Sequence, residues 1–331
     1  MKCKGIVALR QAVVDLIDVE ITPPAANEVQ VQMATSLVSP GTERAWILGL
    51  ENSRPSYPYI PGYCCAGWIR QIGSAVEGFT VGDRVACYAV QVGHRQIGNV
   101  PAYRVVKIPD NVSFHHAAFT SLGQTSLQGV RKCKIELGEA SASIGMGLVG
   151  ILALQLAKLN GSNPVVAVDI VPSRLEIAKL CGADFIYDSC EYSEQSWHSE
   201  VGAKPAIVFE NTGVASVMRQ ACTLAADYGR VCILGCPRGT VDFNFYSLVQ
   251  KKSITIIGAH AVDSIPKAHS YPNYWTFADD ARCFLQFIAQ GRIPLDPMIT
   301  DVVPWKESLG IYKKSLEGNS DTLGIIIDWE S

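Results

Sequence analysis

Hydrophobic and polar positions alternate in short runs along the first hundred residues. Runs at 5–9, 28–34, 66–72 and 83–88 have the two-residue period and the composition of β-strands. Proline and glycine pairs, such as Pro61-Gly62, provide the turns between them. The pattern predicts a compact β-barrel at the start of the chain.

From Phe114 to Gly258 the pattern changes. Stretches of helical length alternate there with short apolar runs at 142–144, 165–168, 185–187, 206–209, 231–234 and 254–257. Strands separated by helices imply right-handed crossovers and a parallel sheet. The pattern predicts a doubly wound nucleotide-binding domain. A helix over 277–290 and a strand over 323–327 follow it, so the chain closes with elements outside that domain.

Length and composition narrow the class of protein. The 331 residues suit two domains, and a hydrophobic content of 48% provides a large core. The net charge of −3 offers no basic field for a phosphate backbone, which argues against nucleic acid as the main partner. We see no secretory signal and no apolar run of about 20 residues, so we expect a cytoplasmic protein without a membrane partner. The 11 cysteines contain no CxxC pair and are interpreted as reduced thiols.

The strongest local motif is a glycine-rich turn between the strand at 142–144 and an apolar helix. It consists of Gly145, Met146, Gly147, Leu148, Val149 and Gly150. The first glycine allows a tight turn, the second lets a pyrophosphate approach the backbone, and the third lets helix and strand pack closely. The start of the helix offers free N–H groups and a positive dipole end to the phosphates.

Asp169 ends the next strand, in the place of a carboxylate that binds the adenosine ribose hydroxyls and disfavours a 2′-phosphate. NAD(H) is therefore the predicted cofactor. Arg174 follows in the next helix, and its positive charge leaves tolerance of NADP(H) open. A glycine packing cluster with a helix-capping aspartate is the alternative. The complete order of strand, turn, helix, strand and acid favours the dinucleotide site.

Longer segments of the chain resemble the medium-chain dehydrogenase/reductase superfamily, in its zinc-type alcohol dehydrogenase-like form. They are GFTVGDRV at 78–85, RLEIA at 174–178, GAD at 182–184, ENTG at 210–213 and GRVCILG at 229–235. The resemblance covers nearly the whole chain and implies an α/β fold. A GroES-like β-barrel catalytic domain would contain residues 1–117 and 262–331. A Rossmann domain with a doubly wound parallel sheet would be inserted at 118–261.

The resemblance also implies further binding residues. Asp169 and Arg174 would face the adenosine ribose, and Thr125 would lie behind the nicotinamide ring. The nicotinamide half would be lined by Thr212, Gly213, Val214, Leu234, Gly235, Cys236, Pro237, Gly258 and His260. A polar and aromatic loop follows, in which sugar or polyol hydroxyls would meet His269, Tyr271 and Trp275. A surface loop between domains is the equally open alternative.

The chain departs from zinc-dependent members at their ligand motifs. Pro40 replaces the cysteine of the first motif, Tyr63 replaces the histidine of the second, and Ser121 stands at the helix position. Only Cys64 remains a plausible ligand, whereas a catalytic zinc needs about three protein ligands. The four-cysteine lobe of the structural zinc is also missing, because only Cys87 occurs between residues 82 and 109. We therefore predict no metal site.

Two thiols and two histidines leave one alternative to that prediction. Cys64 and Cys65, together with His94 or His116, would form an adventitious metal site. We interpret the two cysteines instead as buried strand thiols.

Without zinc, a side chain must move the proton during hydride transfer. Tyr63 is the first candidate, and Thr42 matches the Ser/Thr that relays protons in relatives. A barrel-core tyrosine and a turn hydroxyl are the alternatives. Glu43 and Arg44 follow Thr42 and would be exposed or form a structural ion pair.

The leading hypothesis is a zinc-independent, NAD(H)-dependent dehydrogenase that oxidises a secondary alcohol such as a sugar, cyclitol or polyol. The Pro-Gly-Tyr and Gly-Thr-Glu turns also resemble dehydrogenases of bacteriochlorophyllide-like hydroxyethyl tetrapyrroles. A quinone or enone reductase and a non-enzymatic NAD(H)-binding scaffold or redox sensor stay open. The partners would be a small alcohol or ketone and further copies of the chain, as a dimer or tetramer, because an apolar edge strand at 253–258 needs cover.

Overall fold

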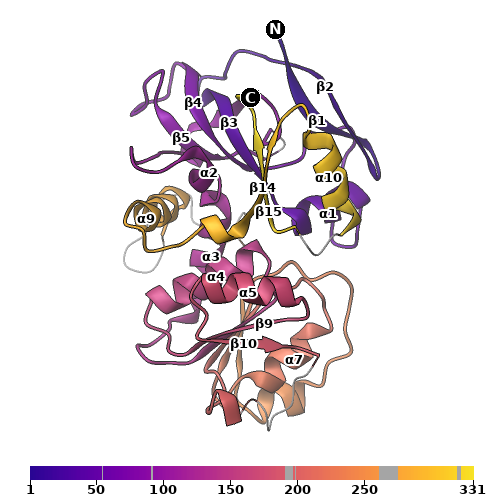
Figure 1. Cartoon of the computed structure of the whole chain (residues 1–331), viewed down its shortest axis with the longest axis vertical. Helices are drawn as coiled ribbons and strands as arrows, with labels where there is room; N and C mark the ends of the chain where they lie inside the picture. The colour runs from indigo at the N-terminus through magenta and orange to yellow at the C-terminus, as the bar shows by residue number, and fades with distance from the viewer. Residues whose placement is uncertain (54, 91, 191–196, 198, 261–274, 319–321) are drawn as a thin grey trace. The chain divides into compact units, whose positions relative to one another are not determined.

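The computed structural model describes all residues except 54, 91, 191–196, 198, 261–274 and 319–321 (Figure 1). The chain forms two compact units. The first contains Met1–Ser121, Pro266–Gly291 and Ile299–Ser331, and the second contains Leu122–Ile265 and Arg292–Met298. The second unit thus includes Arg292–Met298, although the sequence placed all of 262–331 with the barrel.

The first unit is built on a seven-stranded sheet whose order is β14-β15-β3-β4-β5-β7, with β6 also paired to β3. These strands are β3 (Glu28–Val38), β4 (Cys64–Ile72), β5 (Arg84–Tyr88), β6 (Ile97–Pro101), β7 (Val105–Lys107), β14 (Ile299–Pro304) and β15 (Gly324–Asp328). A separate antiparallel pair consists of β1 (Lys2–Arg10) and β2 (Val13–Glu20). β15 pairs antiparallel with β3, so the last strand of the chain returns to the first domain.

Short helices surround this sheet: α1 (Pro40–Leu48), η1 (Ala102–Arg104), α2 (Phe114–Ala117), α9 (Phe277–Ala289) and α10 (Ser308–Glu317). Nearly every side chain of β3 is buried, because the strand has neighbours on both edges and packs on both faces. Val31, Ile69 and Ile327 belong to the apolar core that results.

The second unit is a six-stranded parallel sheet of order β10-β9-β8-β11-β12-β13. Its strands are β8 (Ser141–Ile144), β9 (Val165–Asp169), β10 (Phe185–Asp188), β11 (Ile207–Glu210), β12 (Arg230–Ile233) and β13 (Thr255–Gly258). All six predicted strands are present, and their order is that of a doubly wound dinucleotide-binding fold. β9 and β10 follow β8 on one side of it, and β11, β12 and β13 follow on the other. Ligands of such sheets bind at this switch point between β8 and β11.

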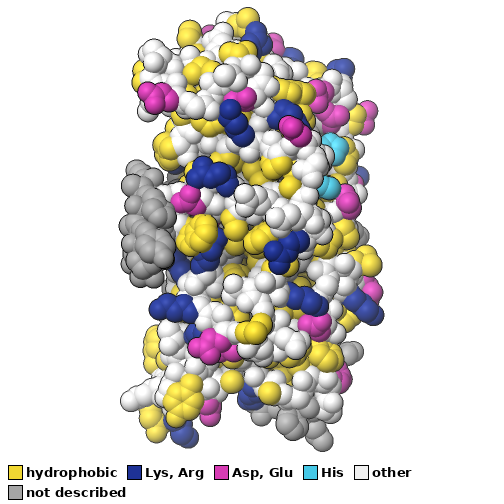
Figure 2. All heavy atoms as spheres, turned by 90° about the vertical axis from the view of Figure 1, so that its left-hand side faces the viewer, with side chains coloured by type: hydrophobic (Ala, Val, Ile, Leu, Met, Phe, Trp, Pro, Cys, Tyr) yellow, Lys and Arg dark blue, Asp and Glu magenta, His cyan; other side chains and the backbone are white. Residues whose placement is uncertain are grey.

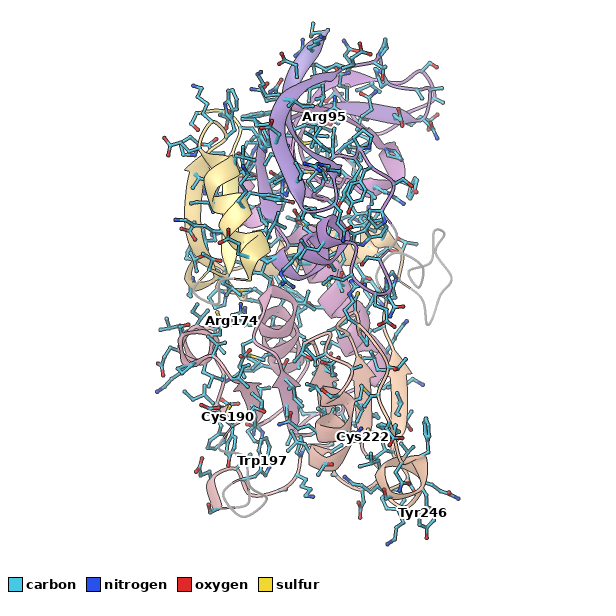
Figure 3. The ribbon with its side chains drawn as sticks, turned by 90° about the vertical axis from the view of Figure 1, so that its right-hand side faces the viewer. Arg95, Arg174, Cys190, Trp197, Cys222 and Tyr246 are labelled. Atoms are coloured by element: carbon cyan, nitrogen blue, oxygen red, sulfur yellow. The ribbon has the colours of Figure 1, made fainter. Side chains whose placement is uncertain are left out.

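The helices of the second unit are α3 (Thr120–Cys133), which starts in the first unit, α4 (Leu148–Leu159), α5 (Pro172–Leu180), α7 (Val217–Leu224), η2 (Tyr246–Gln250) and η3 (Asp296–Met298). Trp197 and Cys222, labelled in Figure 3, are buried in the apolar layer against the sheet. In the described part of the chain, no helix has the length and apolar character needed to cross a membrane.

Candidate active site

The glycine-rich turn joins β8 to α4 at the carboxyl edge of the parallel sheet. Gly145 has φ +91, a left-handed conformation that favours glycine, and a Cβ there would lie 2.8 Å from Thr212 Cγ2. A Cβ on Gly150 would lie 1.9 Å from the Gly145 carbonyl oxygen. A Cβ on Gly147, by contrast, would meet no described atom within 4 Å. Side chains at Gly145 and Gly150 would therefore collide with neighbouring atoms, whereas the space next to Gly147 is empty of described atoms. This space fits the approach of a pyrophosphate to the backbone.

Asp169 ends β9 and is 7% exposed. Its carboxylate accepts hydrogen bonds from the backbone N–H groups of Met146 at 2.5 Å, Ile170 at 2.7 Å and Val171 at 2.9 Å. The carboxylate thus ties the end of β9 to the glycine-rich turn.

Arg174 lies in α5, five positions after Asp169 along the chain, and is labelled in Figure 3. Its Nε is buried and has no hydrogen-bond partner among the residues that the structure describes. An unpartnered guanidinium nitrogen in the helix that follows the ribose-binding acid fits a role in cofactor binding.

The turns after β11 and β12 meet at the same edge of the sheet. Gly213 has φ +69, and a Cβ there would lie 2.9 Å from the Cys236 carbonyl oxygen. The Arg238 N–H donates to the Gly213 carbonyl at 2.9 Å. Gly258 pairs with Ile233 at the end of β13. The predicted cofactor turns at 145–150, 212–214, 235–237 and 258–260 therefore follow neighbouring strands of one sheet.

Glu210 is a site residue to which the sequence assigned no role. It is fully buried at the end of β11, and its carboxylate accepts from the N–H of Thr212 at 2.7 Å and from the Thr212 hydroxyl. Burial raises the pKa of Glu210, although hydrogen bonds from Thr212 and Gly213 offset part of the rise. The signal was its place in the ENTG motif, directly before the turn that it holds.

In the first unit, the predicted pair Tyr63 and Thr42 comes together around Ser39. The Tyr63 hydroxyl donates to Ser39 Oγ at 2.8 Å, and the Thr42 side chain also hydrogen-bonds to the phenol. Ser39 is the N-cap residue of α1, but its hydroxyl makes no capping bond and is free to receive the phenol. The sequence missed Ser39, which precedes the Pro-Gly-Thr-Glu turn.

The surroundings of Tyr63 are aromatic and partly buried. Its ring contacts Tyr88 edge-on, with centroids 5.3 Å apart, and Tyr88 in turn contacts Phe277 at 5.7 Å. Burial raises the pKa of Tyr63 well above its ordinary value, and the hydrogen bonds of Ser39 and Thr42 offset only part of this effect. Tyr63 is therefore a neutral phenol at physiological pH and is able to donate a proton.

Several other predicted residues have defined places. Thr125 is half-buried on α3, Cys236 and His260 are exposed, and Trp275 is 42% exposed just before α9. His269 and Tyr271 lie outside the described residues.

The positions that carry zinc ligands in zinc-dependent members hold Pro40, Tyr63 and Ser121 in this chain. Pro40 has no ligand atom, and the Ser121 hydroxyl is a hydrogen-bond partner of the Cys64 thiol. Burial and the charge of Glu43 raise the pKa of Cys64 well above its ordinary value. Within the described ranges, no group of three or more His, Cys, Asp or Glu side chains is placed to hold a metal ion.

The sequence favoured an exposed or structural ion pair of Glu43 and Arg44. Glu43 is instead 3% exposed, and its carboxylate contacts His94 Nε2 at 2.8 Å. Arg44 does not take part and donates to the Leu316 carbonyl at 2.8 Å. The adjacent thiols Cys64 and Cys65 are buried on β4, in agreement with their interpretation as strand cysteines.

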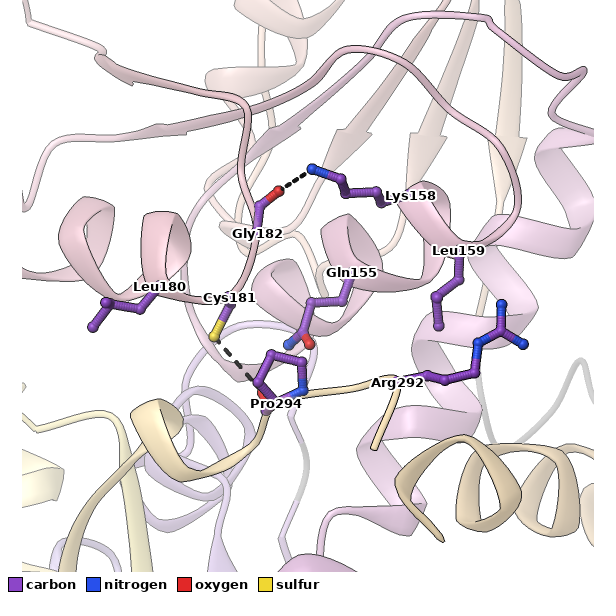
Figure 4. A pocket seen from close by; sticks show the side chains of 8 residues that line it. All are labelled: Gln155, Lys158, Leu159, Leu180, Cys181, Gly182, Arg292 and Pro294. Atoms are coloured by element: carbon purple, nitrogen blue, oxygen red, sulfur yellow. Dashed lines mark hydrogen bonds between the residues drawn. The ribbon is translucent and has the colours of Figure 1, made fainter. Parts of the chain in front are cut away.

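A separate pocket of about 220 Å³ lies in the second unit, away from the cofactor turn (Figure 4). Its wall includes Gln155 and Lys158 near the C-terminal end of α4, whereas the glycine-rich turn is at the N-terminal end of that helix. Lys158 is already paired with the Gly182 carbonyl at 2.8 Å and with Asp184 at 2.5 Å. This pocket therefore has no role in the chemistry of the glycine-rich turn.

Comparison with known proteins identifies the family. An alcohol dehydrogenase GroES-like domain model matches residues 25–115, and a zinc-binding dehydrogenase model matches residues 149–280. The chain belongs to the medium-chain zinc-type alcohol dehydrogenase family. Both predicted domain folds are thereby confirmed, and the chain is an NAD(P)-dependent oxidoreductase of the class that acts on CH–OH groups.

Among curated relatives, L-threonine 3-dehydrogenase of Pyrococcus horikoshii is 26% identical, over 86% of this chain and 87% of the relative. Sorbitol dehydrogenase of Bacillus subtilis is 24% identical, over 82% and 81% respectively. Among solved structures, a putative zinc-binding dehydrogenase from Sinorhizobium meliloti bound to NADP has a TM-score of 0.85 at 19% identity, covering 99% of this chain and all of that one. The last similarity supports the fold alone.

Proposed function

We propose that this chain is a zinc-independent, NAD(H)-dependent dehydrogenase of secondary alcohols, in which Tyr63 transfers the proton. The observation that carries the proposal is the hydrogen bond from the Tyr63 hydroxyl to Ser39, beside Thr42, at the position where zinc-dependent relatives place a ligand. The presence of a sorbitol dehydrogenase among the relatives supports a polyol as the substrate class.

The described residues also fit the cofactor. When bound, the nicotinamide would accept a hydride from the alcohol carbon or return it to a ketone. The open backbone at Gly147 and the free N–H groups of α4 would hold the pyrophosphate. Asp169 would face the ribose hydroxyls and disfavour a 2′-phosphate, which supports NAD(H) over NADP(H). Glu210 would hold the Thr212–Gly213 turn against the nicotinamide half.

Tyr63 would supply the proton that accompanies hydride transfer. A developing alkoxide is far more basic than a phenolate, so the neutral phenol would protonate it during ketone reduction. Ser39 accepts from the phenol in the resting site and would orient its O–H bond. In the direction of alcohol oxidation, the phenolate form of Tyr63 would receive the proton and become the phenol again. The raised pKa of Tyr63 makes this direction slower at neutral pH and faster at alkaline pH.

The test compares Tyr63→Phe with wild type on a panel of sorbitol, butane-2,3-diol and myo-inositol with NAD⁺. We expect a loss of kcat of about 100-fold or more, with NADH affinity unchanged, because a general acid contributes roughly 10²–10⁴. Tyr103→Phe, which removes the hydroxyl of an exposed tyrosine, is the matched control. Full activity in Tyr63→Phe, or stoichiometric zinc by elemental analysis, would overturn the proposal. NADH binding without turnover of any alcohol would favour the scaffold.

We also propose that the chain assembles with itself through β13, the edge strand of the parallel sheet. Its Ile256 and Ile257 are only partly covered. Light scattering coupled to size-exclusion chromatography at micromolar concentrations tests this, and a monomer throughout would contradict it.

A further inference from the structure

A buried polar chain crosses the first unit next to Tyr63. Glu43, His94, Ser36, Tyr312 and Trp329 form it, and none of the five is more than 3% exposed. His94 contacts Glu43 Oε2 through Nε2 and Ser36 Oγ through Nδ1, both at 2.8 Å. The Tyr312 hydroxyl donates to Glu43 Oε2 at 2.5 Å, and Trp329 Nε1 donates to Ser36 Oγ at 2.8 Å.

Within this group of five side chains, every hydrogen bond can be assigned one donor and one acceptor. Indole and tyrosine groups act here as donors, so Glu43 accepts as a carboxylate and Ser36 accepts from Trp329. Ser36 then has its own proton for His94 Nδ1, and His94 Nε2–H donates to Glu43. A Ser–His–Glu set of this kind resembles a nucleophilic triad, but Ser36 is fully buried and has no access to a substrate. A role in holding the structure is what remains.

One end of this chain holds the turn that contains Ser39 and Thr42. The second oxygen of Glu43 accepts from the Ser39 N–H at 2.7 Å, and the Glu43 N–H donates to the Ser39 carbonyl at 3.0 Å. The carboxylate therefore accepts from the N–H of the N-cap residue, as the acidic side chain of a capping box does. The Ser39 hydroxyl makes no capping bond of its own and accepts from Tyr63.

His94, the next member after Glu43, holds the segment that contains Tyr63. The His94 N–H donates to the Pro61 carbonyl at 3.1 Å. Gly62 has φ +84, and a Cβ on it would lie 2.6 Å from His94 Cδ2, so the imidazole ring packs directly against this backbone. The same His94 ring thus supports the residue before Tyr63 while its Nε2 contacts Glu43.

We propose that Glu43 and His94 are a positioning pair that sets the Tyr63 hydroxyl in register with Ser39 and Thr42. The proposal rests on the proposed function of Tyr63. In zinc-dependent relatives, coordination to the ion fixes the side chains at these motifs. In this chain, one buried hydrogen bond between Glu43 and His94 joins the two segments instead. Neither residue touches the substrate, so the pair acts on the proton transfer only through the place of Tyr63 and Ser39.

The decisive variant is Glu43→Gln, which keeps the side-chain shape. Three donors converge on the two oxygens of Glu43, and an amide has only one oxygen. With the amide NH₂ towards Ser39, the contact with the Ser39 N–H is lost. With the NH₂ towards His94 and Tyr312, these groups must rearrange to accept, so in either orientation the link between the two segments is disturbed. We expect kcat on the best alcohol of the panel to fall about 10- to 100-fold, as for a small misplacement of catalytic groups, with KM and NADH affinity within about twofold.

The matched control is Trp329→Phe, which removes one donor from the far end of the same chain, where neither Ser39 nor Gly62 is contacted. Its stability should fall by a similar amount, while kcat stays within about twofold of wild type. Equal losses of kcat in Trp329→Phe and Glu43→Gln would mean that kcat falls because the fold is destabilised in general. This result would overturn the proposal.

A double variant separates the proposal from the function on which it rests. If Glu43 acts through Tyr63, then Glu43→Gln should cost less than about twofold in the Tyr63→Phe background. An unimpaired Tyr63→Phe would overturn the proposed function. An impaired Tyr63→Phe with an unimpaired Glu43→Gln, or with fully additive losses, would overturn the positioning pair alone.

A further measurement does not depend on a substrate. Hydrogen exchange of the Ser39 amide should accelerate in Glu43→Gln and not in Trp329→Phe. If Glu43→Gln does not fold, Tyr312→Phe replaces it, because it removes a single donor from the same oxygen. A smaller loss of kcat that also disappears in the Tyr63→Phe background is then expected, and an additive loss would contradict the proposal.

Discussion

Two glycines of the cofactor turn should respond in opposite ways to the same substitution. Gly150 lies in the first turn of α4, where a Cβ would stand 1.9 Å from the Gly145 carbonyl oxygen. Gly147 precedes the helix with φ −78 and ψ −177, a conformation that alanine adopts freely, and its Cβ would meet no described atom within 4 Å. Alanine at Gly150 should therefore damage the fold, and alanine at Gly147 should damage only cofactor binding.

The size of the first effect follows from the distance. Real Cβ atoms essentially never come closer than 3.0 Å to such an atom, so β8 and α4 must separate by more than 1 Å. The obstructing atom belongs to the backbone and cannot rotate away as a side chain would. Overpacking of this kind costs about 1–3 kcal/mol, and a backbone obstruction belongs at the upper end. For a chain of 331 residues, Gly150→Ala should lower the Tm by roughly 3–4 °C.

Differential scanning fluorimetry without cofactor and fluorescence titration with NADH separate the two outcomes. Gly147→Ala should keep the Tm within about 2 °C and weaken NADH binding at least about tenfold, which is 1.4 kcal/mol. A wild-type Tm in Gly150→Ala would refute the packing argument. Wild-type NADH affinity in Gly147→Ala would refute the placement of the pyrophosphate.

Three further predictions concern single side chains. Asp169→Asn should raise the affinity for NADPH relative to NADH about tenfold in paired titrations, because the charge that repels a 2′-phosphate is lost while Arg174 remains; an unchanged ratio would remove Asp169 from the ribose site. Burial raises the native pKa of Glu210, so the wild type should lose stability relative to Glu210→Gln as pH rises above 4.5; parallel Tm–pH curves would contradict this. Thr276 caps α9, so Thr276→Ala should cost about 1 kcal/mol in urea unfolding. Burial opposes ionisation of Asp279, but Thr276 and Arg282 lower its pKa from 3.8 to about 2; the wild type should therefore lose this contribution progressively as pH falls from 3.8 to about 2, and equal acid sensitivity of the variant would count against it.

The Rossmann unit was predictable because each of its signals is local. A buried parallel strand and the helix after it are both read from consecutive residues, and Gly145, Gly150 and Asp169 occupy fixed places in that order. The parallel sheet of a doubly wound domain followed from the alternation of strands and helices. The sequence did not reveal that Asp169 would also accept three backbone N–H groups, because this depends on how closely the turn folds back on β9.

The first unit was harder to predict because its contacts join distant parts of the chain. Glu43 follows a turn and has the sequence context of a surface charge, yet its partners His94 and Tyr312 are 51 and 269 positions away. β2 was missed, since its alternation exposes charged residues such as Asp15 and Asp18. No pattern in a single sequence indicates that a helix near the C-terminus will place a hydroxyl on a carboxylate near the N-terminus.

The long-range contacts of the first unit determine how rigidly the side chains of the candidate active site are fixed. A metal ion fixes several side chains at once through short bonds of defined geometry. A buried carboxylate achieves less per contact, but Glu43 accepts three hydrogen bonds, and each comes from a different segment of the first unit. Removing one partner would leave a buried charge unsatisfied, which costs more than the bond itself contributed. In the zinc-independent site that we propose, rigidity would therefore come from the burial of Glu43 and from the three segments that its carboxylate joins.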